Sequence, residues 1–280
     1  SSQVRGANSI GAGGSALILV DGVETDITTV NSEDIESISV LKDASSTAVY
    51  GSRGTFGVIL ITTKRPEKGQ MKITYNGSYN FYKRTVTPEL VDNGYDWTTS
   101  YLEAYTNSYA TDPTNINNVF RFSRAWYSEL ERRNSDPSYE KWRINPADNR
   151  YEYFGNTNWY KIFYKDYTTG HQHNLSITGG TDKASYYVSG RFFHQDGIYN
   201  AGDDRYNQYN VLAKGTVQAT KWLRVENTTS FMSRFSHQPT LTTGGQSFTV
   251  TPTRMMNHQG FPMTLEKNPD GTWTDAAVYM

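Results

Sequence analysis

The sequence has no cysteine, almost no net charge and no long apolar run. Its 280 residues carry 27 lysines and arginines against 28 aspartates and glutamates. Without cysteine, neither a disulfide framework nor a thiolate zinc site can form. The balanced charge gives no overall field that would attract nucleic acid. No stretch of about 18 apolar residues occurs, so no transmembrane helix is expected. The first residue stands directly before a motif, and no signal peptide is visible.

Aromatic residues are the abundant class, with 21 tyrosines, 12 phenylalanines and 6 tryptophans. Many aromatics without any long apolar run are typical of a membrane β-barrel, whose strands place apolar residues at every second position.

Residues 31–64 are predicted to form a short helix, a strand, a second short helix, a glycine-rich turn and a second strand. Ser32 is the expected N-cap of the first helix. Gly51 ends the second helix, and two further glycines allow a tight bend that a Cβ would obstruct. The β-branched run at residues 58–63 is typical of a strand buried on both faces.

A two-residue alternation of apolar and polar side chains begins at residue 71 and returns at the length of barrel strands. It predicts strands at residues 71–84, 172–179, 184–194, 205–219 and 222–235. The side chains expected to face lipid are Tyr75, Tyr79, Val188, Phe192, Val211 and Ala213. Those expected to face the lumen or a plug are Asn76, Asn80, Ser189, Asn210 and Lys214. A soluble sheet with one wet face would produce the same pattern.

Three motifs in order carry a resemblance. They are Asp-Ile-Glu-Ser-Ile-Ser-Val-Leu-Lys-Asp-Ala at residues 34–44, Tyr-Gly-Ser-Arg-Gly at 50–54 and Gly-Val-Ile-Leu-Ile-Thr-Thr-Lys at 57–64. Together they closely resemble the plug domain of TonB-dependent outer-membrane transporters, most of all the SusC/RagA branch. Thr55 and Phe56 depart from the small residues that are more usual there. The resemblance extends from residue 4 to about residue 235 and is weakest over 85–150.

The resemblance implies an α+β plug domain over residues 1–66, followed by antiparallel transmembrane β-barrel strands over 67–280. The first five or six strands form only a partial β-barrel, since transporters of this kind close with about 22. The chain is therefore expected to belong to a longer protein. A long loop at about 85–168 is expected on the extracellular side, with helices near 88–105 and 115–133.

The function that this family implies is import across the outer membrane, where the protein contacts lipid. The expected substrates are nutrient oligomers, above all glycan oligosaccharides and sometimes peptides. Expected partners are the TonB complex, which supplies energy, and a SusD-like surface lipoprotein. No enzymatic activity and no cofactor are expected. Two alternatives stay open: a siderophore or cobalamin receptor of the same class, and a soluble carbohydrate-binding β-protein.

Aromatic side chains in the long loop are the candidate substrate-binding residues. Trp97, Tyr101 and Tyr105 recur at four-residue spacing, which places them on one face of a helix. Together with Trp126 they are candidates for stacking on a sugar. The alternative is that these rings pack the loop against the barrel or the plug.

Two arginines are candidate plug–barrel latches. Arg5 and Arg53 lie in the plug motifs Val-Arg-Gly and Gly-Ser-Arg-Gly, and a guanidinium enclosed in a barrel needs an acidic partner. Each is predicted to meet an aspartate or glutamate on the barrel wall, mostly on later strands. The alternative is that both are ordinary surface arginines.

No catalytic or metal site is predicted. His171 and His173 share a strand face but lack further ligands at a suitable spacing. The adjacent carboxylates Glu33 and Asp34 fit a helix start better than an acid–base pair.

Overall fold

The computed structural model describes residues 16–116, 120–200, 202–239, 241–243, 246–250 and 260–278, with the backbone alone for 241–250 and Val278. These residues form two compact units. The first contains the described residues up to Phe81 together with Thr169–Asp196 and Arg205–Ser236. The second contains Tyr82–Thr168, Gly197–Asp204 and the chain from His237 onward.

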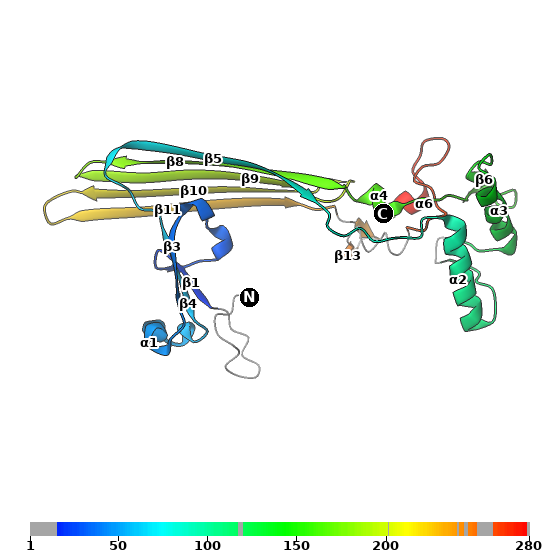
Figure 1. Ribbon diagram of the computed structural model, residues 1–280, viewed down its shortest axis with the longest axis horizontal. Helices are drawn as coiled ribbons and strands as arrows, with labels where there is room; N and C mark the ends of the chain where they lie inside the picture. The colour runs from blue at the N-terminus through cyan, green and yellow to red at the C-terminus, as the bar shows by residue number, and fades with distance from the viewer. Residues whose placement is uncertain are drawn as a thin grey trace. The chain divides into compact units, whose positions relative to one another are not determined.

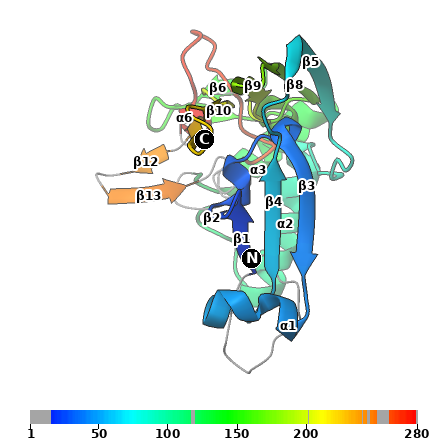
Figure 2. The ribbon, with the colours of Figure 1, turned by 90° about the vertical axis from the view of Figure 1, so that its left-hand side faces the viewer.

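A four-stranded sheet forms the N-terminal part of the first unit. We call this N-terminal part the plug. Its order is β2-β1-β4-β3, with β1 (Leu17–Val20) parallel to β4 (Val58–Thr63) and β3 (Ile35–Leu41) antiparallel to it. Figure 2 shows β1, β4 and β3 side by side. Val58 and Ile61 are 0% and 1% exposed, which confirms the prediction of a buried strand.

A two-residue turn joins β1 to the short strand β2 (Val23–Glu24). Val20 pairs with Val23, so Asp21 and Gly22 alone make the turn, with φ of 50° and 87°. Two positive φ values in a two-residue hairpin favour an Asp-Gly pair, since these residues tolerate the left-handed region. The turn thereby holds the Asp21 side chain at the end of the plug sheet.

The 3-10 helices η1 (Ile27–Thr29) and η2 (Ser32–Asp34) lead into β3. The prediction of Ser32 as N-cap is wrong by one residue. Asn31 is the cap of η2, because its side chain accepts a hydrogen bond from the N–H of Glu33. The second predicted helix is present as α1 (Ala44–Thr47) and η3 (Ala48–Gly54), and Gly51 takes the positive φ of 60°.

Five long antiparallel strands complete the first unit and lie side by side in Figure 1 in the order β11-β10-β9-β8-β5. Their bounds are β5 (Gly69–Lys83), β8 (Tyr167–Gly180), β9 (Ala184–Asp196), β10 (Arg205–Gln218) and β11 (Arg224–His237). Val188 pairs with Ile177 and with Ala213, which fixes the register of the three central strands. We call the side of this sheet that contacts the plug the plug-facing side, and the other the outer side.

The strand side chains that contact the plug lie on the predicted face of the sheet. Asn76, Asn210 and Lys214 contact plug residues, whereas Val188 and Val211 lie on the outer side and are 41% and 45% exposed. The outer side also carries a row of ring contacts that joins Tyr79, His171, Phe192, Tyr209 and Phe235 across the five strands.

The second unit contains helices and short strands. Its elements are α2 (Gly94–Tyr109), α3 (Arg124–Ser135), β6 (Trp142–Ile144), β7 (Tyr151–Tyr153), α4 (Trp159–Phe163), β12 (Leu241–Thr243), β13 (Gln246–Val250) and α6 (Asp275–Val278). The two long helices begin later than predicted because Asn93 and Ser123 cap them, each accepting from backbone N–H groups of the first turn. No helix in the described ranges is both long and apolar enough to cross a membrane.

Candidate functional site between the plug and the strands

A salt bridge joins the β1–β2 turn to strand β10. The Nζ of Lys214 lies 2.9 Å from Oδ2 of Asp21, and their side chains are 8% and 24% exposed. Thr63, at the end of β4, donates to the same carboxylate from its hydroxyl at 2.6 Å and from its backbone N–H at 3.0 Å. Lys214 also donates to the Thr63 carbonyl oxygen at 3.2 Å. One lysine of the sheet therefore holds the ends of two plug strands.

A second contact is built on a buried carboxylate. Asp34 is 3% exposed and accepts hydrogen bonds from the hydroxyl of Tyr187 at 2.8 Å and from Nδ2 of Asn31 at 3.1 Å. Asn31 also donates to Oδ1 of Asn174 on β8 at 2.8 Å. Because a buried carboxylate without partners is costly, these bonds fix η2 against two neighbouring strands.

Two further amide side chains of the sheet reach the plug. Asn210 on β10 donates to the carbonyl oxygen of Thr29 at 2.8 Å, and Asn76 on β5 donates to Oε2 of Glu33 at 3.1 Å. We use the name plug contact for the whole set. It joins Asp21, Thr29, Asn31, Glu33, Asp34 and Thr63 of the plug to Asn76, Asn174, Tyr187, Asn210 and Lys214 of the sheet.

The electrostatics of Asp21 follow from its partners. Burial alone would raise the pKa of this carboxyl, but the hydrogen bonds from Thr63 and the hydrogen bond and charge of Lys214 outweigh burial and lower the pKa below its ordinary value of 3.8. Asp21 is therefore ionised at neutral pH, and the pair with Lys214 is a charged one.

Cavities border the plug contact on two sides. One of about 700 Å³ is lined by polar and charged residues that include Asp21, Lys183 and Glu226. Another of about 270 Å³ reaches Asp34 and Asn210. Both are large enough and polar enough to hold water. Water at these positions can replace each protein partner in turn, so the arrangement is suited to a contact that holds the plug and can also release it.

The structure places one predicted latch arginine and leaves the other outside the described residues. Arg53 pairs with Glu24 of β2 at 2.8 Å, and their side chains are 73% and 59% exposed. This partner belongs to the plug itself. Arg5 lies outside the described part of the chain. Pairing of either arginine with a barrel wall stays a prediction.

Three of the four predicted substrate-binding residues form a ladder along α2. The Trp97 and Tyr101 rings stack with centroids 5.5 Å apart and planes at 7°, and Tyr105 follows Tyr101 at 6.0 Å. Tyr109 extends the ladder by another ring at 4.7 Å. Trp97 and Tyr101 are partly buried against the apolar core of the second unit, and the Tyr101 hydroxyl donates to the carbonyl of Asn115 at 3.4 Å.

Trp126 is separate from this ladder. It is 3% exposed in the apolar core of the second unit, and its indole N–H donates to the carbonyl of Tyr153 at 3.3 Å. Leu102 from α2 and Leu130 from α3 belong to the same core. In this structure Trp126 can support a binding surface only by packing beneath it.

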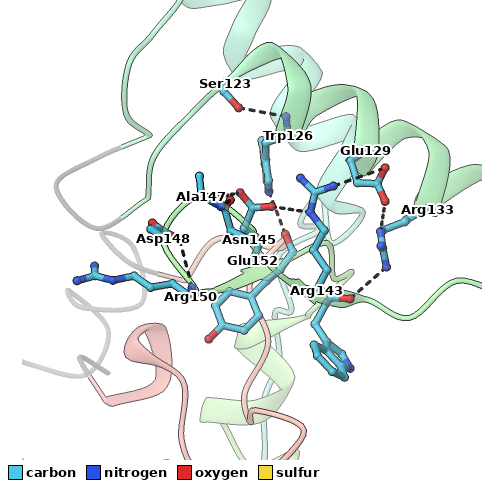
Figure 3. A network of polar contacts seen from close by, with 12 residues as sticks. Ser123, Trp126, Glu129, Arg133, Arg143, Asn145, Ala147, Asp148, Arg150 and Glu152 are labelled. Carbon is cyan, nitrogen blue, oxygen red and sulfur yellow. Dashed lines mark hydrogen bonds and ion pairs between the residues drawn. The ribbon is translucent and has the colours of Figure 1, made fainter.

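Charged residues pack against this core: the guanidinium of Arg133 lies 4.8 Å from the ring centroid of Phe154. Figure 3 shows the polar network that includes Arg133. Glu129 accepts from Nε of Arg133 at 2.6 Å, and Arg143 donates to Glu152 at 2.7 Å. Burial alone would raise the pKa of Glu129, but its bonds with Arg132 and Arg133 lower it below the ordinary value. Among the described residues, no group of three or more histidine, aspartate or glutamate side chains is arranged to hold a metal ion.

Sequence reasoning missed the plug half of the contact. In the sequence, Asp21 belongs to an Asp-Gly turn and Asp34 lies at a helix start, whereas Asn31 has no predicted role because Ser32 is the predicted cap. The available signal was on the sheet side, where the alternation placed Asn210 and Lys214 toward the plug.

Comparisons with known proteins agree with this architecture. The TonB-dependent Receptor Plug Domain family matches residues 1–58. TonB-dependent receptor P3 of Formosa agariphila is 32% identical over 226 residues, which cover 80% of this chain and 18% of that protein. TonB-dependent receptor SusC of Bacteroides thetaiotaomicron is 45% identical over 92 residues, 29% of this chain and 9% of that protein. The chain is a SusC-like TonB-dependent receptor sequence. It spans less than a fifth of the length of either relative.

Solved structures share the fold of this SusC-like chain. A chain in the structure of the RagAB peptide transporter superposes with a TM-score of 0.65 at 24% identity, covering 98% of this chain and 30% of that one. The RagAB peptide importer in its open-open state gives 0.58 at 25% identity, covering 84% and 26%. The predicted plug followed by antiparallel strands of a partial barrel is thus confirmed. The names of these relatives, receptors and importers, support the expectation that the chain is not an enzyme.

Proposed function

We propose that this SusC-like chain is part of an outer-membrane importer of nutrient oligomers, in which residues 1–66 form the plug and residues 67–280 the first strands and loops of the barrel. The observation that carries the proposal is the plug contact. It is polar and bordered by cavities, as expected of a plug that must be held at rest and released on demand. The names of the related receptors support the same reading.

Release would be driven by the TonB complex pulling on the plug, and a SusD-like lipoprotein would cover the outer opening. Residues 85–168 would lie on the extracellular side, near that lipoprotein. The match to SusC supports this branch over a siderophore or cobalamin receptor. The plug motifs argue against a soluble carbohydrate-binding protein.

The substrate class that we propose first is glycan oligosaccharides, with the α2 ladder of Trp97, Tyr101 and Tyr105 as the contact surface and Trp126 supporting it from beneath. Tyr101 and Tyr105 are only half-buried, and a phenol hydroxyl can hydrogen-bond to an oligomer. A second candidate is peptides, which is favoured by the similarity to a RagAB peptide importer.

Growth of the source bacterium tests the proposed function. Deleting the gene for the full-length receptor should abolish growth on one class of oligomer, glycan or peptide, while growth on the matching monomers continues. The protein should fractionate with the outer membrane and need detergent for extraction. Unchanged growth on every oligomer, or recovery in the soluble periplasmic fraction, would contradict the proposal.

A variant with alanine at Tyr101 and Tyr105 tests the ladder separately. It should weaken oligomer uptake at limiting concentration, while alanine at Tyr139, outside the ladder, should not. Equal uptake by both variants would limit these rings to packing.

A further inference from the structure

Arg191, on the plug-facing side of the sheet, has no carboxylate partner in the plug contact. Arg191 of β9 stands directly between Asn174 and Asn210 in the register of the sheet. Both neighbours are hydrogen-bonded to the plug: Asn174 accepts from Asn31, and Asn210 donates to Thr29. Arg191 instead donates from Nη2 to Oε1 of Gln172 at 3.1 Å, one row further from the plug contact.

The plug carboxylates that act on Arg191 at longer range are already engaged. Glu33 and Asp34 exert their charge on it, but Glu33 accepts from Asn76 and Asp34 from Tyr187. No carboxylate of a described residue lies within ion-pair distance of the Arg191 guanidinium. Arg191 is only half-buried, so part of the residue remains accessible.

The next rows supply an aromatic and amide wall. The guanidinium of Arg191 lies over the ring of Phe193, 5.0 Å from its centroid. Phe193 stands opposite both Gln172 and Gln208 and meets the Tyr206 ring edge-on at 6.0 Å. The Tyr206 hydroxyl donates to Gln208 at 2.8 Å. Among the described residues, no hydrogen bond joins these side chains to the plug, so this wall begins where the plug contact ends.

We propose that Arg191, together with Gln172, Phe193 and Tyr206, forms a subsite for a carboxylate carried by the imported oligomer. A guanidinium presents parallel N–H donors that match the two oxygens of a carboxylate, and stacking on Phe193 holds its plane in place. The inference rests on the proposed function and deepens it, since it assigns a charge to the substrate. A uronate-containing oligosaccharide and an acidic peptide share this chemistry.

Binding to the purified full-length receptor in detergent tests the subsite. The probes are a short oligogalacturonate against its methyl ester, and a glutamate-containing pentapeptide against the same peptide with glutamine. The receptor should bind the acid of one pair roughly tenfold more tightly than its neutral partner, as expected for charge-assisted hydrogen bonds. The pair that shows the preference identifies the source of the carboxylate.

Arg191→Gln should abolish this preference while binding of the neutral probe stays the same. Arg191→Lys, which keeps the charge and loses the fork, should retain part of it, and Lys221→Gln in an exposed turn should retain all of it. No preference for either acid in the wild-type receptor would overturn the subsite, and so would a preference that survives Arg191→Gln. Either result leaves the proposed function standing if the gene deletion still abolishes growth on a neutral oligomer.

Discussion

Two contacts within the molecule differ in chemistry: one is apolar and the other is polar. In the second unit, α2 and α3 meet through an apolar core in which Leu130, Phe154 and Met263 are 0–1% exposed. In the first unit, the plug meets the long strands through hydrogen bonds and a salt bridge, among them those of Asp34 and Lys214.

The two contacts differ in the free energy that their separation costs. Separating an apolar core exposes its whole area to water, which water does not compensate. Separating a polar contact exchanges protein partners for water, so the net loss per hydrogen bond is small. The second unit is therefore held together by packing, and the plug is held by bonds that can be exchanged for water.

The largest effect is expected in the apolar core. Leu130→Ala removes a side chain that is 0% exposed and should destabilise the second unit by roughly 2–5 kcal/mol, because a cavity remains. Limited proteolysis of the full-length protein between α2 and α3 measures this loss. Leu90→Ala, at a position 48% exposed, is the matched control and should have little effect. Equal proteolysis of the two variants would show that this core is not what holds the unit.

A charge on the outer side of the sheet comes next. Val188→Lys should destabilise the barrel by roughly 2–4 kcal/mol if this side faces lipid near the middle of the membrane. Urea titration of the receptor refolded in lipid vesicles measures the change in the free energy of unfolding. Thr216→Lys, on the plug-facing side of β10 and next to a polar cavity, is the control and should be tolerated. A larger loss of stability for Thr216→Lys than for Val188→Lys would show that the outer side does not face lipid.

The plug contact should respond less to mutation, and should respond to acid. Lys214→Met leaves Asp21 with Thr63 alone and should weaken the contact by about 1–3 kcal/mol, since it removes one charge-assisted bond. Force spectroscopy that pulls the plug from its N-terminal end measures the change. Lys221→Met, in an exposed turn, should leave the force unchanged. A wild-type force in the Lys214→Met variant would show that this salt bridge does not hold the plug.

The pKa of Asp21 fixes the sign of the pH dependence. The pKa is lowered in the folded protein, so the contact gains its full stability from Asp21 above pH 3.8, the ordinary value, and loses it as the pH falls through the lower folded value. The force should be constant between about pH 5 and 8 and should fall below about pH 4. Asp21→Asn should reduce that fall.

The smallest effect is expected at Arg53. Its pair with Glu24 is largely exposed, and pairs of this kind contribute roughly 0–1 kcal/mol. Arg53→Gln should therefore leave the unfolding of the plug almost unchanged. In the full-length receptor, a loss of plug retention in this variant and in Arg5→Gln would instead support the predicted latch to the barrel wall.

Patterns within short stretches of sequence predicted the strands and the order of the plug elements. The two-residue alternation gave the strands and the correct side for Asn210 and Lys214, because side chains of a strand must alternate. The glycine and β-branched runs gave the order of the plug elements. The cap at Asn31 was missed by one residue, since serine and asparagine are equally suited to that role.

Contacts between distant segments could not be predicted in this way. Asp34 meets Tyr187 across 153 residues of sequence, and no periodicity near either residue carries that information. Met263 completes the core of the second unit from far along the chain, beyond the helices it packs against. The candidate ladder at Trp97, Tyr101 and Tyr105 was visible because it lies within one helix.

The plug contacts the sheet at Asn31, and the proposed function requires it to leave this contact during import. Cysteines placed at Asn31 and Asn174, whose side chains are 2.8 Å apart, can be joined by a short bis-maleimide in the full-length receptor. We predict efficient cross-linking and loss of oligomer import, whereas cysteines at Asn31 and Ile177, on the outer side, should not cross-link and should leave import intact. Failure of the Asn31–Asn174 pair to cross-link, or normal import by the cross-linked receptor, would contradict this prediction.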